Sequence, residues 1–88
     1  MIRWEDKKAE KILRERGIDL FAVEEEILSG RFTTRPVDNQ EGHPGQTMFI
    51  VVLDDYAVCA PFVEGEGDDF FIKTAFRSRK WNERRPLW

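Results

Sequence analysis

The sequence predicts a single α+β domain over residues 1–88, with two N-terminal helices packed on a four-stranded antiparallel sheet and a short basic C-terminal helix. Three observations support this prediction. The length suits one domain and is too short for two. Hydrophobic residues are spaced as in helices up to residue 30 and alternate as in strands from residue 31. Hydrophobic residues make up 41% of the chain and aromatic residues 12%, more than disordered chains contain.

The first helix is expected to run to about Arg16. Residues 1–4 form a short extended segment, after which Glu5 or Asp6 offers an acceptor for the free backbone N–H groups of the helix. Gly17 lies where a helix commonly ends in a left-handed residue. The hydrophobic stripe of this helix consists of Ala9, Ile12 and Leu13.

The second helix follows after a short connection. Asp19 can cap its first turn, and Gly30 is placed to end it as Gly17 ends the first helix. The glutamates at 24–26 are expected on the outer face as solvated surface. The residues that keep the 3.6-residue period are Leu20, Val23 and Ile27.

Four strands are expected from residue 31 onward, at 31–35, 46–53, 56–63 and 70–76. The second is hydrophobic on both faces, which predicts a central place in the sheet. Asp54 and Asp55 indicate a tight hairpin turn, so the second and third strands should pair antiparallel. Pro61 has no N–H group, and the third strand must therefore bulge or lie at an edge there. A short helix over 78–85, stopped by Pro86, ends the chain.

The charged residues are segregated along the chain. Residues 1–70 contain eight Lys or Arg and 16 Asp or Glu, a net charge of −8, whereas residues 71–88 contain six and one, a net charge of +5. Together they give the overall charge of −3. A basic segment on an acidic body predicts a local surface for anions or nucleic acid rather than a uniformly basic protein.

The composition also excludes several classes of protein. One cysteine, Cys59, and no hydrophobic N-terminal segment predict a cytoplasmic protein without disulfides. The longest hydrophobic run, at 48–53, is far shorter than the about 20 residues that a membrane helix needs. A single histidine and a single cysteine do not make a zinc site, and the sequence has no phosphate-binding loop or nucleophile motif. We therefore expect no metal, no cofactor and no membrane segment.

Several segments of the chain form a recognisable series. They are Trp-Glu-Asp-Lys-Lys-Ala at 4–9, Ile-Leu-Arg-Glu-Arg-Gly-Ile-Asp-Leu at 12–20, His-Pro-Gly-Gln at 43–46, and the segments 56–63, 72–74 and 77–80. In this order they resemble the BrnT family of bacterial type II toxins and a close branch of it, over about residues 3–85. Lys8 falls on a lysine of the family, while Arg16 stands where the family usually has histidine. The resemblance implies a RelE-like fold and a toxin that cleaves mRNA or inhibits translation, neutralised by a ribbon-helix-helix antitoxin.

Metal-free cleavage of RNA by such a toxin involves three tasks. The ribose 2′-hydroxyl attacks the neighbouring phosphate, so the protein must remove a proton, stabilise the charge of the phosphorane and protonate the leaving oxygen. Cations suit the phosphate, and histidine, which ordinarily titrates near neutral pH, suits the proton transfers. A histidine in a Gly/Pro loop can also be a plain turn residue. The candidate catalytic residues are Lys8, His43, Arg77, Arg79 and Lys80, with Lys8 joining the others if the first helix packs across the sheet.

Aromatic and basic residues alternate near the C-terminus. Trp81, Arg84 and Arg85 are candidate RNA-binding residues, because cations hold phosphates and an indole can stack on a base. Phe76 and Trp81 are each open to a second interpretation, in which Phe76 belongs to the core and Trp81 packs the C-terminal segment onto the body of the protein. Two strand residues with reactive side chains are expected only to pack: Tyr56 and Cys59.

A second hypothesis involves no catalysis. In it the chain is a toxin-like binding module or co-repressor, whose basic C-terminal segment docks an acidic segment of a protein partner. The net charge of −3 favours this hypothesis, because an acidic body repels RNA. Both hypotheses predict a tight complex with an antitoxin protein, and the first adds RNA, free or bound to the ribosome, as the target.

Overall fold

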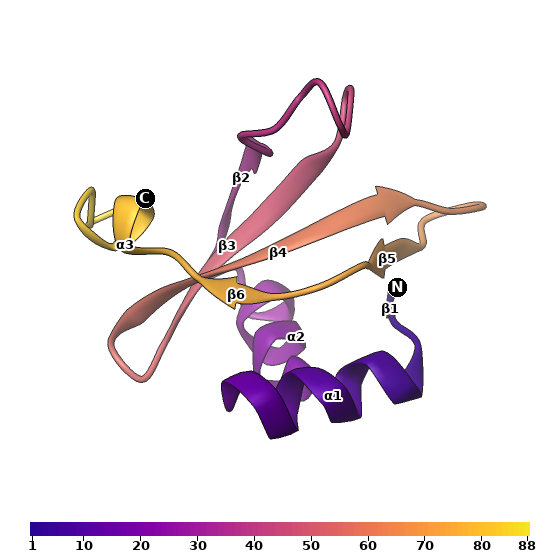
Figure 1. The fold of residues 1–88 in the computed structure, drawn as a ribbon, viewed down its shortest axis with the longest axis horizontal. Helices are drawn as coiled ribbons and strands as arrows, with labels where there is room; N and C mark the ends of the chain where they lie inside the picture. The colour runs from indigo at the N-terminus through magenta and orange to yellow at the C-terminus, as the bar shows by residue number, and fades with distance from the viewer.

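A mixed six-stranded sheet carries two helices on one face and a short third helix on the other (Figure 1). The computed structural model describes residues 1–88. In chain order the elements are β1 (Ile2–Arg3), α1 (Asp6–Arg16), α2 (Leu20–Leu28), β2 (Thr33–Pro36), β3 (Thr47–Leu53), β4 (Tyr56–Glu64), β5 (Phe70–Ile72), β6 (Phe76–Arg77) and α3 (Arg79–Asn82). The predicted α+β class is confirmed. The predicted four-stranded, wholly antiparallel sheet is wrong, since the sheet has six strands and one parallel pair.

The first helix ends at the predicted Gly17, whereas α2 ends at Leu28 with Ser29 as its C-cap, one residue before the predicted Gly30. Gly17 follows α1 with a φ of 68°, and its amide donates to the carbonyl of Leu13. Asp19 caps α2, because its carboxylate accepts a 2.9 Å hydrogen bond from the amide of Phe21. The predicted side-chain cap of α1 is not formed: Glu5 occupies the N-cap position without a capping bond. None of the helices has both the length and the apolar character needed to cross a membrane.

The strands lie in the order β1-β5-β4-β3-β2, and β6 also pairs with β4. Every pair is antiparallel except β1 with β5. The short extended segment predicted at residues 1–4 therefore contains a parallel edge strand. The hairpin between β3 and β4 is confirmed, with Leu53 opposite Tyr56. Asp54 and Asp55 both have positive φ angles, 51° and 61°, as a two-residue turn between twisted strands favours.

The predicted strand over 70–76 is two strands, which pair with different parts of β4. Ile72 of β5 lies opposite Phe62, and Phe76 of β6 lies opposite Cys59. Pro61 faces the gap between them, where its carbonyl accepts a 2.8 Å hydrogen bond from the amide of Lys73. The missing N–H of a proline on that side costs no ladder bond, because no strand is paired there. No bulge forms, since the register of β4 with β3 is continuous through this point, whereas the predicted alternative of an unpaired edge at Pro61 is confirmed by the gap between β5 and β6.

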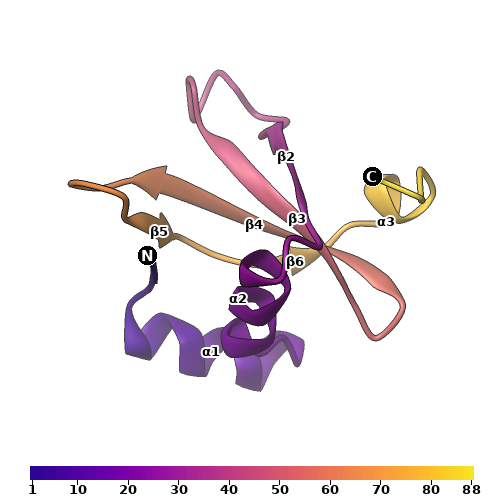
Figure 2. The same ribbon diagram turned by 180° about the vertical axis from the view of Figure 1, so that it is seen from behind.

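Alternating side chains give β3 and β4 two hydrophobic faces, which we call the α1–α2 face and the α3 face. Figures 1 and 2 show α1 and α2 together on one side of the sheet and α3 apart from them in both views. On the α1–α2 face the two strands contribute Phe49, Val51, Val58, Ala60 and Phe62. On the α3 face they contribute Met48, Ile50, Ala57 and Cys59, which pack against Val37, Trp81 and Leu87. The prediction that β3 is central and buried on both faces is confirmed.

The C-terminal helix is shorter than the predicted 78–85. Ser78 caps α3, and its hydroxyl oxygen accepts a 3.2 Å hydrogen bond from the amide of Trp81. The helix ends at Asn82, whose side-chain oxygen accepts a 3.1 Å hydrogen bond from the amide of Ala57 in β4. The contact between Asn82 and Ala57 holds α3 against the α3 face of the sheet.

Candidate functional site

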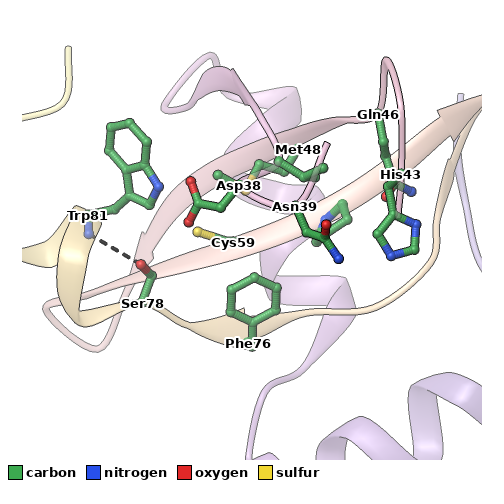
Figure 3. Close-up of a pocket in the computed structure, with 11 residues that line it drawn as sticks. Asp38, Asn39, His43, Gln46, Met48, Cys59, Phe76, Ser78 and Trp81 are labelled. Carbon is green, nitrogen blue, oxygen red and sulfur yellow. Dashed lines mark hydrogen bonds between the residues drawn. The ribbon is translucent and has the colours of Figure 1, made fainter. Parts of the chain in front are cut away.

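A cavity of about 290 Å³ opens on the α3 face of the sheet (Figure 3). The loop 37–46, which connects β2 to β3, forms one wall, and the segment from β6 to α3 forms the opposite wall. The floor is the paired strands β3 and β4. Its lining residues are Val37, Asp38, Asn39, His43, Gln46, Met48, Cys59, Pro61, Phe76, Ser78 and Trp81.

The loop 37–46 is held in place by its own side chains. The Gln40 amide donates to the carbonyls of Val37 at 2.7 Å and Gln46 at 3.2 Å, and its oxygen accepts from the amide of Gly45 at 3.0 Å. Asn39 accepts a 3.0 Å hydrogen bond from the amide of Gly42. His43 is therefore presented at the mouth of the cavity by a loop with internal support, and its side chain is exposed.

Cys59 lies on the cavity floor and is fully buried. Burial raises the pKa of its thiol from 9.0 to about 11, with a smaller opposing effect of a hydrogen bond to Ser78. A thiol with this pKa stays protonated at neutral pH and is a poor nucleophile. The expectation that Cys59 is a packing residue is confirmed by its burial.

Three cations surround the indole ring of Trp81. The guanidinium carbons of Arg35 and Arg84 lie 5.7 and 5.1 Å from the ring centroid, and Nζ of Lys80 lies 5.1 Å from it. We call Arg35, Lys80 and Arg84 the cation group. Cations placed over an aromatic face are attracted by its negative charge density, so Trp81 helps to hold them together.

The cation group is only partly neutralised. Nζ of Lys80 lies 2.8 Å from Oδ1 of Asp38, and both side chains are largely exposed. An exposed ion pair of this kind contributes little to stability and exchanges readily with other anions. Nothing among the ion pairs neutralises Arg35 or Arg84. The surface beside the cavity is therefore positive on a protein whose net charge is negative.

Trp81 also carries a polar atom without a partner. Its Nε1 is buried and makes no hydrogen bond, and Figure 3 shows this nitrogen turned toward the cavity. Buried N–H groups are nearly always paired, with protein or with another molecule. Trp81 thus packs against the hydrophobic cluster of the α3 face, as its second interpretation predicts, and also borders the cavity.

Arg77, a predicted catalytic residue, lies on the other face of the sheet. In the pairing of β6 with β4, Phe76 is opposite Cys59 and Arg77 is opposite Val58. Because paired residues share a face, Phe76 borders the cavity and Arg77 projects toward α1. There its guanidinium donates to the carbonyl of Arg16 at the end of α1. Strand alternation therefore separates Arg77 from the cavity.

Two further predicted catalytic residues stand away from the cavity lining. Lys8 lies on α1, beside a small hollow that Arg16 and Thr74 also line, so the packing of α1 does not bring it to His43. Arg79 is 86% exposed, and its nearest acidic group is Glu83, at 4.0 Å. Neither residue lines the cavity or lies over the Trp81 ring.

Arg85, a predicted RNA-binding residue, holds the C-terminal segment to the turn between β3 and β4. One guanidinium nitrogen donates to the carbonyl of Asp55 at 2.8 Å, and the other to its carboxylate at 2.7 Å. A further hydrogen bond of 3.2 Å joins Arg85 to Asn82. These contacts give Arg85 a structural role at this position.

The structure thus divides the predicted site residues into two sets. Beside the cavity lie His43, Lys80, Trp81 and Arg84. Away from it lie Lys8, Arg77, Arg79 and Arg85.

Two residues of the site were not expected from the sequence. Arg35 belongs to β2, opposite Met48, and this pairing puts it on the α3 face beside Trp81. Asp38 lies two residues after Pro36, the last residue of β2. Its carboxylate accepts a hydrogen bond from Nζ of Lys80. No feature of the neighbouring sequence identifies Arg35 as a residue of the site. Asp38 could have been predicted, because it lies in the same polar loop as His43.

A second, more hydrophobic groove of about 460 Å³ lies at the other end of the sheet, near the N-terminus. Residues of α2, β1, β2 and β5 line it, among them Ile27, Leu28, Phe32 and Phe70. Leu28 is 73% exposed there. The groove contains no histidine and one carboxylate, so it lacks the groups that RNA chemistry requires.

Comparison with known proteins does not assign the chain to a family. No model of a protein family matches it, and no curated protein matches it. The structure also has no group of three or more His, Cys, Asp or Glu side chains that could hold a metal ion. The cavity and the cation group are therefore the features from which a function can be inferred.

Proposed function

We propose that this protein is the toxin of a bacterial type II toxin–antitoxin pair, and that it binds RNA at the cavity on the α3 face and cleaves it without a metal ion. One observation carries the proposal. The only histidine of the chain borders a cavity whose opposite wall meets three clustered cations. This combination offers proton transfer and phosphate binding on one side of the sheet.

The chemistry is attack by the ribose 2′-hydroxyl on the neighbouring phosphorus, which forms a cyclic phosphate and releases the 5′-oxygen. Lys80 and Arg84 hold the phosphate and stabilise the charge that develops on it. Asp38 releases Lys80 when the phosphate takes the place of its carboxylate. His43 exchanges a proton with the reacting oxygens, and its position on a loop tip lets it approach them.

The test compares two double variants in cells and in a cleavage assay. Lys80→Ala with Arg84→Ala is expected to abolish growth arrest and RNA cleavage. The control, Lys7→Ala with Arg14→Ala, removes the same charge from exposed positions of α1 and should remain toxic. His43→Ala is expected to lower the cleavage rate about 100-fold or more while RNA binding persists. A folded Lys80/Arg84 variant with full toxicity would contradict the proposed site.

The second candidate function is a toxin-like module that binds without cleaving. It is favoured by the dispersal of the predicted catalytic residues, because Arg77 and Lys8 lie away from His43. One histidine then remains for two proton transfers. Purified protein that binds RNA or an acidic peptide at low salt but yields no cleavage products would establish this function instead.

The partner that we propose for either function is an antitoxin of the ribbon-helix-helix type, encoded beside this chain. Co-expression of the neighbouring reading frame should restore growth and yield a complex of the two proteins on size-exclusion chromatography. Growth arrest that persists in spite of a stable neighbour protein would argue against a toxin–antitoxin pair.

A further inference from the structure

The cavity on the α3 face has the size and the walls of a site for one small planar group. Its volume, about 290 Å³, is at the lower end of the roughly 300–1,000 Å³ of small-molecule sites. Met48 and Val37 give it a hydrophobic interior, and Phe76 stands at its edge with 38% of its surface exposed. An exposed aromatic ring beside a hydrophobic interior is the kind of surface on which unstacked nucleobases pack.

The polar groups around this interior include both hydrogen-bond donors and hydrogen-bond acceptors. Nε1 of Trp81 is a buried donor without a partner, and the Asp38 carboxylate is an acceptor. The side-chain amide of Gln46 can donate and accept, and the hydrogen bonds of the loop use Gln40 rather than this amide. The edge of a nucleobase likewise presents donors and acceptors side by side. A phosphate, which only accepts, would be repelled by Asp38.

The cation group stands next to the cavity and not inside it. Arg35, Lys80 and Arg84 surround Trp81 but do not line the cavity, whereas Trp81 belongs to both. A nucleotide has the same division, with an uncharged base and a negative phosphate beside it. An acidic peptide would match the cations, but its side chains would meet the Asp38 carboxylate in the cavity.

We infer that the cavity receives one unstacked base of a single-stranded RNA, while the cation group holds the adjoining phosphates. The base packs on Phe76, accepts a hydrogen bond from Trp81 and pairs its edge with Asp38 and Gln46. This inference rests on the proposed RNA function and specifies how its site selects a substrate. It predicts that the protein prefers unpaired RNA and that some bases bind better than others.

The experiment measures the affinity of fluorescently labelled RNA hexamers by anisotropy at low salt. All riboses carry 2′-O-methyl groups, which prevents cleavage and keeps the readout independent of activity. The probes are the four homopolymers, an abasic hexamer with the same backbone, and an acidic peptide. We expect at least one homopolymer to bind about tenfold or more tightly than the abasic hexamer, because one stacked base is lost.

Two variants locate the effect. Phe76→Ala removes the stacking wall, and Gln46→Leu removes the amide at a partly exposed position where folding is easily retained. Each should lower the affinity for the preferred hexamer severalfold and leave the affinity for the abasic hexamer unchanged. Phe21→Ala, at an exposed position on α2, is the matched aromatic control and should change neither. Circular dichroism and thermal melting report that the variants are folded.

The possible results distinguish failure of the proposed base site from failure of the proposed RNA function. Equal affinity for the abasic and base-containing hexamers would overturn the base site and leave RNA binding intact. Binding of no RNA probe would overturn the proposed function together with the inference. Tighter binding of the acidic peptide than of any hexamer would overturn both and identify the binding module.

Discussion

Burial determines the chemical behaviour of single residues at this site. Cys59 illustrates this best, since its thiol borders a cavity and still lies at 0% exposure, with a pKa near 11. Trp81 shows the complementary case, in which a residue packs in a hydrophobic cluster and keeps a buried polar atom free. Both residues look reactive or polar in the sequence, and both derive their roles from the atoms packed around them.

The raised pKa of Cys59 predicts a decrease in stability at high pH. The unfolded thiol loses its proton near pH 9, whereas the folded thiol keeps it until about pH 11. Between these values the folded state binds more protons, so the free energy of unfolding should fall as pH rises through this range. Below pH 9 the contribution is fully present.

Urea titrations at pH 8, 9, 10 and 11 would measure this effect against Cys59→Ala. The variant lacks the thiol, so its stability should decrease less steeply above pH 9, whatever the lysines and the tyrosine contribute to both proteins. Parallel curves for the two proteins would show that the thiol is not shielded as its burial implies.

At the scale of elements, two arginines join α1 to the β5–β6 segment. Arg16 donates to the hydroxyl of Thr74 at 3.0 Å and to the carbonyl of Ala75 at 2.7 Å. Arg77 donates in the opposite direction, to the carbonyl of Arg16. The guanidinium lies beside the free carbonyls at the C-terminus of α1, where a positive charge is favourable. These contacts give both Arg16 and Arg77 a structural role at the end of this helix.

Arg77→Ala is therefore expected to affect stability more than RNA binding. The loss of a charged hydrogen bond at an exposed helix end should lower the free energy of unfolding by about 1 kcal/mol, measured by urea denaturation. The affinity for RNA hexamers should stay within twofold of the parent protein. Arg14→Ala, in the last turn of the same helix but without such contacts, serves as the control. A large loss of RNA affinity in folded Arg77→Ala would show that Arg77 belongs to the RNA-binding site.

At the scale of the whole molecule, the charge segregation of the sequence becomes a local surface. The cations of the basic C-terminal segment have two different environments. Arg77 and Arg85 are hydrogen-bonded to the protein body, whereas Lys80 and Arg84 belong to the cation group. Arg35, from the acidic part of the chain, completes that group. Under the proposed function, a positive patch on a protein of net charge −3 would limit RNA binding to one place.

This arrangement predicts a weak salt dependence of RNA binding. Three phosphate contacts on a single strand correspond to a slope of about −2 for the logarithm of the binding constant against the logarithm of salt concentration. Lys80→Ala should make the slope less negative by about 0.7, and Lys7→Ala on α1 should leave it unchanged. Anisotropy titrations between 50 and 300 mM salt, roughly the range in which such slopes are measured, would check this. A slope that Lys80→Ala does not alter would place the phosphates elsewhere.

Much of the fold was predictable because it depends on neighbours in the chain. Gly17 ends α1, Asp19 caps α2, and Asp54 with Asp55 turns β3 into β4, each through bonds or backbone angles within a few residues. The two hydrophobic faces of β3 follow equally from alternation along one strand. The break in the predicted strand 70–76 could not be foreseen, because it depends on which residues of β4 lie opposite.

The sequence by itself determined the α+β class, the end of the first helix and the start of the second, the central hairpin, and a histidine loop with a basic C-terminal segment. The tertiary structure alone decided which of those charges act together. A shift of one residue in strand pairing sends a side chain to the opposite face. The pairing of Arg77 with Val58 therefore turns that arginine toward α1, and the pairing of Arg35 with Met48 brings a distant arginine to Trp81.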